Sequence, residues 1–265
     1  MNKSIRHIIF LLVAICITLP IAVVFVWSIA DSWRFPGLLP ESFGMRGVNE
    51  ILNRNVIQVL LSSIGISSVV ALLSTIIGTL TARAMVFYDF YMKGLVRFLI
   101  ILPIMIPAVA FTFGIHVFFI RFGVSDTVLG VILIHLICGL PYSVYILSDI
   151  TASAGKNLEE QAYLLGASTP RAFFNISFFA LIPGFITSFC MAYIISFSQY
   201  YVTLIIGGGN VKTLSTVMVP FIQSGDRVLS ASYSVVFVVS TLIVFGVIQW
   251  IGKKISLGRE IELFR

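Results

Sequence analysis

Charged residues are scarce in this chain of 265 residues, and their scarcity indicates its class. Only 11% of the residues are charged, whereas 58% are hydrophobic, and the mean hydropathy is +1.05. These values lie far outside the range of soluble globular domains. No aspartate or glutamate falls well inside any of the long apolar runs. The composition therefore excludes a soluble domain and indicates a membrane protein.

Motifs of the common soluble chemistries are missing as well. No Gly-x-x-x-x-Gly-Lys-Ser/Thr sequence for nucleotides occurs, and we interpret the glycine run at residues 207–209 as a turn. The three cysteines lie in apolar runs, which favours packing over disulfides, and metal ligands at useful spacing are absent. Ser168 has no nearby base to activate it. We therefore expect no enzyme activity, no cofactor and no metal site.

Six apolar runs are long enough to cross a bilayer as helices, which takes about 20 residues each. They cover residues 8–30, 60–84, 97–120, 128–148, 176–200 and 231–251. None shows the alternation of a membrane β-strand. The first run is too long for a signal peptide and lacks a cleavage site, so we interpret it as a retained span. The sequence predicts an all-α membrane protein with six transmembrane helices in a single domain over residues 1–265.

The basic residues predict how these spans are oriented. If both termini are cytoplasmic, eleven of the 17 lysines and arginines fall on the inner side and six on the outer side. This orientation places the loop of residues 149–175 in the cytoplasm. It also explains the net charge of +6 without a nucleic-acid partner. We expect a multi-pass protein of a bacterial cytoplasmic (inner) membrane, surrounded by the lipid bilayer.

Prolines and histidines are the unusual residues inside the predicted spans. Proline bends a helix and frees backbone carbonyls, so each one marks either a static kink or a hinge. The prolines concerned are Pro103, Pro107, Pro141 and Pro183. Ionisable groups inside a membrane usually indicate function. For His116 and His135 we favour hydrogen-bonded packing, with a relay role as the alternative.

Polar side chains gather near the end of the fifth predicted span. They are Tyr193, Ser196, Gln199 and Tyr200. We expect them to line the pathway of a polar solute, with Ser196 and Gln199 as the leading candidates. The alternative is that these groups form hydrogen bonds between packed helices.

The loop before the fifth span contains an amphipathic stretch. Residues 157–167 are mostly helix formers, with Asn157 as a cap, two glutamates in the first turn, and Gly166 as the stop. Glu159, Tyr163 and Gly166 share one face of this helix. A short helix of this kind suits docking into a groove on another protein, and the alternative is a helix lying on lipid headgroups.

This loop resembles a signature of the permease subunits of ABC importers. Glu160-Gln161-Ala162, three further residues and Gly166 are similar to that family's Glu-Ala-Ala, three residues, Gly pattern, with Gln161 in place of the first alanine. Phe178-Phe179 replaces the usual Leu-Pro pair. The order of six spans and the proline positions resemble the same family over essentially the whole chain, most of all the branch that imports polyamines, aminoethylphosphonate, thiamine or ferric iron.

The resemblance implies a permease subunit that forms half of a substrate pathway. A cytoplasmic ABC ATPase dimer would bind the loop between spans four and five as a coupling helix. A second permease subunit, either a copy or a paralogue, and an extracytoplasmic substrate-binding protein would complete the importer. The coupling residues would be Glu159, Glu160, Gln161, Ala162, Leu165 and Gly166. A secondary carrier or channel subunit, and a membrane scaffold that transports nothing, stay as alternatives.

Overall fold

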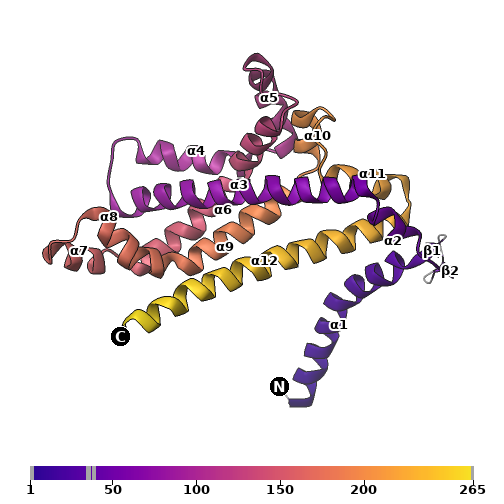
Figure 1. The fold of residues 1–265 in the computed structure, drawn as a ribbon, viewed down its shortest axis with the longest axis horizontal. Helices are drawn as coiled ribbons and strands as arrows, with labels where there is room; N and C mark the ends of the chain where they lie inside the picture. The colour runs from indigo at the N-terminus through magenta and orange to yellow at the C-terminus, as the bar shows by residue number, and fades with distance from the viewer. Residues whose placement is uncertain (1–2, 34–36, 38–39, 264–265) are drawn as a thin grey trace. The chain divides into compact units, whose positions relative to one another are not determined.

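Helices make up most of the computed structural model, which describes residues 3–33, 37 and 40–263 (Figure 1). In hydrocarbon each backbone N–H and C=O needs a partner within the chain, and a helix supplies one for every residue in its interior. Within the described ranges, five helices are long and apolar enough to cross a membrane, or six if one bent pair counts as one span. The predicted all-α membrane class is confirmed.

The chain divides into two units, and the first consists of residues 1–61 and 214–241. Two short strands, joined as an antiparallel pair, follow the first helix. The elements are α1 (Lys3–Ser28), β1 (Ala30–Ser32), β2 (Ser42–Phe43), α2 (Arg46–Ile51), the start of α3 (Arg54–Phe87), α11 (Leu214–Ser224) and the first part of α12 (Arg227–Leu263).

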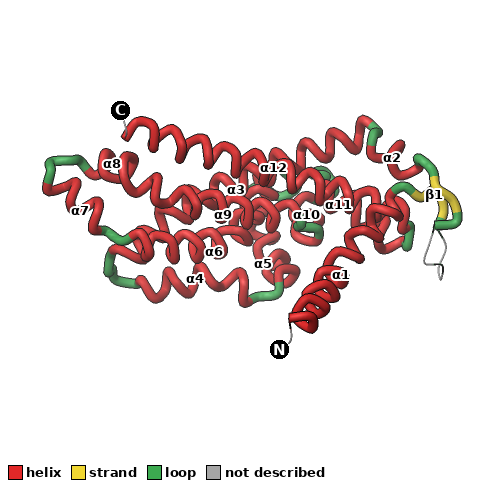
Figure 2. The backbone as a smooth tube through the Cα atoms, turned by 90° about the horizontal axis from the view of Figure 1, so that it is seen from below, coloured by secondary structure: helices red, strands yellow, loops and turns green. Residues whose placement is uncertain are grey.

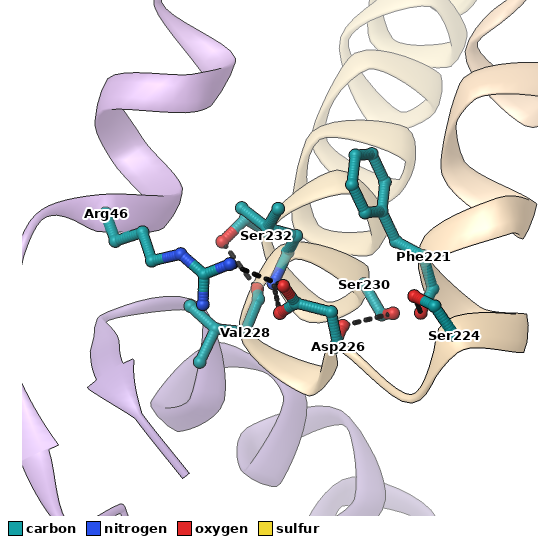
Figure 3. A network of polar contacts seen from close by, with 8 residues as sticks. Arg46, Phe221, Ser224, Asp226, Val228, Ser230 and Ser232 are labelled. Atoms are coloured by element: carbon teal, nitrogen blue, oxygen red, sulfur yellow. Dashed lines mark hydrogen bonds and ion pairs between the residues drawn. The ribbon is translucent and has the colours of Figure 1, made fainter.

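Polar contacts fix the start of α12 in the first unit (Figure 3). Asp226 stands just before the helix and accepts a hydrogen bond of 3.1 Å from the backbone N–H of Leu229, as an N-cap does. The same carboxylate pairs with Arg46 of α2 at 2.5 Å. Close packing supports this pair, because a Cβ atom at Gly47 would overlap the hydroxyl of Ser232.

The second unit consists of residues 62–213 and 242–265. Besides the remainder of α3 and α12, it contains α4 (Lys93–Met105), α5 (Ala108–Arg121), α6 (Val128–Ala154), α7 (Asn157–Leu164), α8 (Thr169–Ala172), the π-helix η1 (Phe173–Ser177), α9 (Phe178–Phe197) and α10 (Tyr201–Gly207). Helix α6 runs along α9 and is the most buried span, with 44% of its most apolar stretch inside (Figure 2). One apolar cluster joins α3, α6 and α10 through Val70, Ile134 and Ile206.

The single span predicted over residues 97–120 is broken in the structure. Helix α4 ends at Met105 and α5 begins at Ala108, and the two helices are bent by 113°. The cause is Pro107, which disfavours the helical conformation for the residue before it. Ile106 is accordingly extended, with φ −91° and ψ 135°. Pro103, in contrast, lies inside α4, and Pro141 and Pro183 lie inside α6 and α9, which continue past them.

Several helices extend beyond the apolar runs from which they were predicted. The fourth run ends at residue 148, but α6 continues to Ala154, so the loop of residues 149–175 begins as helix. Helix α12 likewise continues from the apolar run to Leu263. Apolar length measures only the hydrocarbon-crossing part of a helix, and backbone hydrogen bonding carries the helix on into the polar region.

Asp226 has two roles that separate variants can distinguish. Asp226→Asn keeps an oxygen for the N-cap but removes the charge facing Arg46, whereas Asp226→Ala removes both. Loss of an N-cap costs about 0.5–2 kcal/mol, and a half-exposed ion pair contributes roughly 0–1 kcal/mol. We therefore expect Asp226→Ala to lower the thermal midpoint in detergent more than Asp226→Asn does. Equal midpoints for the two variants would contradict the capping role.

Candidate functional site

The predicted amphipathic loop forms a short helix between two glycine turns. Gly155 has φ +68° after the end of α6, and Gly166 has φ +85° after α7. A positive φ favours glycine, because a side chain there meets the following carbonyl. Gly166 therefore ends this helix as predicted. Asn157 is the first residue of α7 and not its cap, since Lys156 occupies the capping position and no side chain caps the helix.

Most of the predicted coupling residues lie on the outer surface of this loop. Glu160, Gln161 and Gly166 are exposed, and Ala162 is half-buried. Leu165 is 89% exposed, and its neighbour Leu164, which the sequence analysis did not single out, is 88% exposed. The sequence contains a signal for the exposure of Leu164. Two consecutive leucines stand directly before a turn glycine, in a loop that also has charged residues. This surface, residues 160–166, is called the loop tip below.

Glu159 is the exception, because its side chain points inward and is only 5% exposed. The guanidinium of Arg83, near the end of α3, donates two hydrogen bonds to its carboxylate, Nη1 to Oε1 at 2.8 Å and Nη2 to Oε2 at 2.9 Å. Tyr163 donates to Oε2 at 3.3 Å, and Ser177 of η1 donates to Oε1. The i,i+4 neighbourhood of Glu159 and Tyr163 follows the helical spacing.

These hydrogen bonds stabilise the charged form of Glu159. The bonds from Arg83 hold the pKa of the Glu159 carboxyl below its ordinary value, against the opposing effect of burial. The contribution of the pair to stability is therefore complete above the ordinary carboxyl pKa, and it is lost as the pH falls through the lowered one. Arg83 was counted in the sequence analysis only as a basic residue, because a sequence does not show which acid it meets.

A polar cavity lies at the break between α4 and α5 in the second unit. Its volume is 520 Å³, and its lining includes Pro103 and Pro107 at the break, Tyr142 of α6, and Ser198 and Gln199 just after α9. Gln199 is the one predicted pathway residue that contacts this cavity. Non-helical backbone at membrane depth is tolerated where it borders such a cavity.

The other predicted pathway residues lie elsewhere. Tyr193 is fully buried, with its ring stacked 5.3 Å from that of Phe197. Tyr200 is half-buried and its ring meets the edge of Tyr201 at 4.7 Å. Ser196 is 2% exposed and hydrogen-bonds within the helix bundle. These positions match the alternative of contacts between helices more closely than lining of the cavity.

His135 is the centre of the buried polar contacts around Ser196. Its Nδ1 lies 2.9 Å from Ser196 Oγ, and its Nε2 lies 2.9 Å from Thr203 Oγ1. Thr203 donates its own hydrogen to the carbonyl of Gln199, so its oxygen is free to accept from Nε2–H. Through these two contacts the imidazole ties α6 to α9 and α10. His116 is also hydrogen-bonded, through Nε2 to Ser125 Oγ at 3.0 Å.

Known proteins similar to this chain include two transport permeases and one transporter of solved structure. The molybdate/tungstate transport system permease protein WtpB of Pyrococcus abyssi is 29% identical over 199 residues, which cover 75% of this chain and 79% of that protein. The spermidine/putrescine transport system permease protein PotC of Haemophilus influenzae is 24% identical over 220 residues, 82% of this chain and 85% of that protein. A bacterial ABC transporter involved in the import of the acidic polysaccharide alginate contains a chain of similar fold, with a TM-score of 0.71 and 15% identity, covering 94% of this chain and 98% of that one.

A protein-family model also matches this chain. The model for the binding-protein-dependent transport system inner membrane component matches residues 74–257, which is more than half of the chain. The matched range includes α6, α9, the loop tip and the polar cavity. Transport permeases of this family are not themselves enzymes. The chain belongs to the family of binding-protein-dependent transport system inner membrane components and is a multi-pass permease of an ABC importer.

Proposed function

We propose that the loop tip is the place where a cytoplasmic ABC ATPase binds this permease. The observation that carries the proposal is the exposure of Leu164 and Leu165, at 88% and 89%, in a loop that lies outside the spans. Adjacent apolar side chains exposed to water mark an interaction site. An ATPase fits this site because an ABC importer needs one and the chain has no nucleotide-binding motif of its own.

The proposed topology has six spans, with α4 and α5 together forming a bent third span. Both termini then lie in the cytoplasm, and so does the loop between α6 and α9. The excess of basic residues on that side supports this orientation. The turn of residues 88–92 and α7 lie at the same end of the second unit, as this topology requires (Figures 1 and 2).

The proposed solute pathway runs past the polar cavity at the α4–α5 break. Gln199, Ser198 and Tyr142 supply uncharged hydrogen-bonding groups to this cavity. Six spans amount to about half of an importer's pathway, so we expect a second permease, either another copy of this chain or a paralogue. An external substrate-binding protein would deliver the solute to this pair.

The proposed cargo is a small polar solute of the polyamine, aminoethylphosphonate, thiamine or iron type. The cavity presents no charged side chain among its lining residues. The names of two relatives mention solutes of opposite charge, an oxyanion for WtpB and polyamines for PotC. Permeases of similar sequence thus accompany both kinds of solute, which is expected if the binding protein selects the charge.

Gly166→Arg tests whether the loop tip transmits the ATPase cycle. The substitution places a large cation at the tip and a side chain at φ +85°. We expect normal membrane insertion, continued ATP hydrolysis and loss of uptake in proteoliposomes that contain the purified importer. The matched control is Gly225→Arg, since Gly225 also has a positive φ, +77°, with nothing within 4 Å of an added Cβ. Wild-type uptake by Gly166→Arg would contradict the assignment.

The two exposed leucines should contribute directly to ATPase binding. Replacing both Leu164 and Leu165 with Asp removes two apolar anchors, each worth about 1.5–3 kcal/mol if fully buried in the complex. Since 1.4 kcal/mol changes an equilibrium tenfold, we expect the ATPase to be lost on co-purification. The control is Leu52→Asp, because Leu52 is also exposed (66%) and lies just before the first residue of α3. Undiminished co-purification of the double variant would argue against this contact.

Gln199→Cys should be reached by water, whereas Tyr193→Cys should not. Gln199 contacts the polar cavity, and Tyr193 is fully buried. In a chain whose native cysteines are replaced by alanine, a water-soluble thiol reagent should label the first variant in at least one state of the transport cycle. Equal labelling of the two variants, or no labelling of Gln199→Cys in any state, would exclude the cavity as the pathway.

A further inference from the structure

The carboxylate of Glu159 has all of its hydrogen-bonding capacity used inside this chain. An ionised carboxylate accepts about four hydrogen bonds, and Glu159 accepts four, two from Arg83 and one each from Tyr163 and Ser177. Its side chain is 5% exposed. No acceptor site is left for a partner protein. Glu159, one of the predicted coupling residues, therefore has a role different from that of the loop tip.

The donors to Glu159 come from three elements of the second unit. Arg83 belongs to α3, four residues before that helix ends, and Ser177 is the last residue of η1, at the start of α9. Tyr163 belongs to α7 itself. One carboxylate therefore joins the loop helix to two spans that are far apart in sequence.

Two aromatic rings restrict the orientation of the Arg83 guanidinium. Its Cζ atom lies 4.7 Å from the ring centroid of Phe173 and 5.3 Å from that of Phe87. Such contacts with aromatic rings are favourable for a guanidinium. A planar group held by two rings meets a carboxylate with two parallel hydrogen bonds, the geometry observed here.

A second contact joins the start of α7 to α3. Lys156, just before α7, donates a hydrogen bond of 3.0 Å to the carbonyl of Phe87, the last residue of α3. Carbonyls at the end of a helix lack partners in the helix, and a cation there also complements the helix dipole. Lys156 therefore supports the attachment that Glu159 makes.

Helix α7 is short, and links of this kind help to fix its direction. It has eight residues, and isolated helices of this length are marginal in water. Gly155 precedes it and Gly166 follows it, and both adopt positive φ values that only flexible glycine adopts readily. A force applied at the loop tip would rotate this helix between the two glycines unless side chains connected it to the spans.

We propose that Glu159 is a positioning residue that fastens α7 to α3 and to the start of α9, so that movement at the loop tip is passed into both spans. This inference rests on the proposed function in one respect, that the loop tip is where the ATPase acts. Glu159 itself does not contact the ATPase. Arg83 and Ser177 complete the joint, and removal of any one donor weakens it.

The position of α7 can be measured in the permease alone by pulsed electron resonance. Spin labels would be placed at Leu164, 88% exposed, and Tyr91, 95% exposed, in a chain whose three native cysteines are replaced by alanine. We expect a narrow distance distribution in the parent and a broad one in Glu159→Ala. Arg83→Ala should broaden it similarly, and the double variant should add nothing further, since both remove the same joint.

The control separates positioning from a general loss of stability. Asp226→Ala removes an ion pair and a helix cap from the first unit, and it should leave the Leu164–Tyr91 distribution narrow. Glu159→Gln should show intermediate broadening, because the amide keeps an oxygen for Arg83 but loses the charge. A distribution in Glu159→Ala as narrow as in the parent would overturn the proposal.

Coupling is then measured in the complex that co-purifies with the ATPase, using ATP as the only ligand. In the parent, ATP should change the rate at which Gln199→Cys is labelled. In Glu159→Ala the ATPase should still bind and hydrolyse ATP, and the ATP-dependent change in the labelling rate should be lost, because the coupling between the two sites is removed. An unchanged response to ATP would also overturn the proposal.

Failure of the proposed function would look different. If no ATPase binds the parent chain, the loop tip is not the site of coupling, and if ATP does not alter labelling in the parent, the cavity is not the pathway that the ATPase drives. The distance measurements still decide whether Glu159 fixes α7, since they need no partner.

Discussion

The hydrocarbon core of the bilayer imposes the constraint on which this structure depends. Every backbone N–H and C=O within it needs a partner, and every charge must be absent or paired. Long unbroken helices meet the first requirement in α3, α6, α9 and α12. The break at Ile106 and Pro107 is the exception, and it borders a cavity with polar groups such as Gln199. The same constraint that produces the spans therefore also marks the candidate pathway.

The ion pair between Arg83 and Glu159 attaches the loop helix α7 to α3. Arg83 lies near the end of a membrane-spanning helix, where Glu159 neutralises it through two hydrogen bonds. The predicted coupling residues, Glu159 to Gly166, are thereby divided between two proposed tasks. Leu164, Leu165 and Gly166 are exposed, where the proposed ATPase would bind, and Glu159 faces inward toward α3 and η1. A segment that transmits force needs both a surface on which a partner acts and a rigid connection to what must move.

The departures from the sequence predictions each have a local physical cause. Apolar length predicted one span over residues 97–120, but Pro107 forces Ile106 out of the helical region and turns the chain by 113°. Asn157 was predicted as a cap by residue type, whereas Lys156 takes that position and donates to the carbonyl of Phe87. Ser196 and Gln199 are close in sequence, yet a three-residue separation near the end of α9 directs one to His135 and the other to the cavity.

The sequence by itself determined that the chain crosses a membrane as helices, and it located the short helix that ends just before Gly166. These features depend on composition, on the length of apolar runs and on local backbone preferences, which neighbouring residues alone express. The tertiary structure decided which acid meets Arg83, which polar side chain reaches the cavity and which leucines stay uncovered. Those outcomes depend on tertiary contacts. Arg83 and Glu159, for example, are 76 positions apart, and no local pattern specifies the partner of a side chain at such a separation.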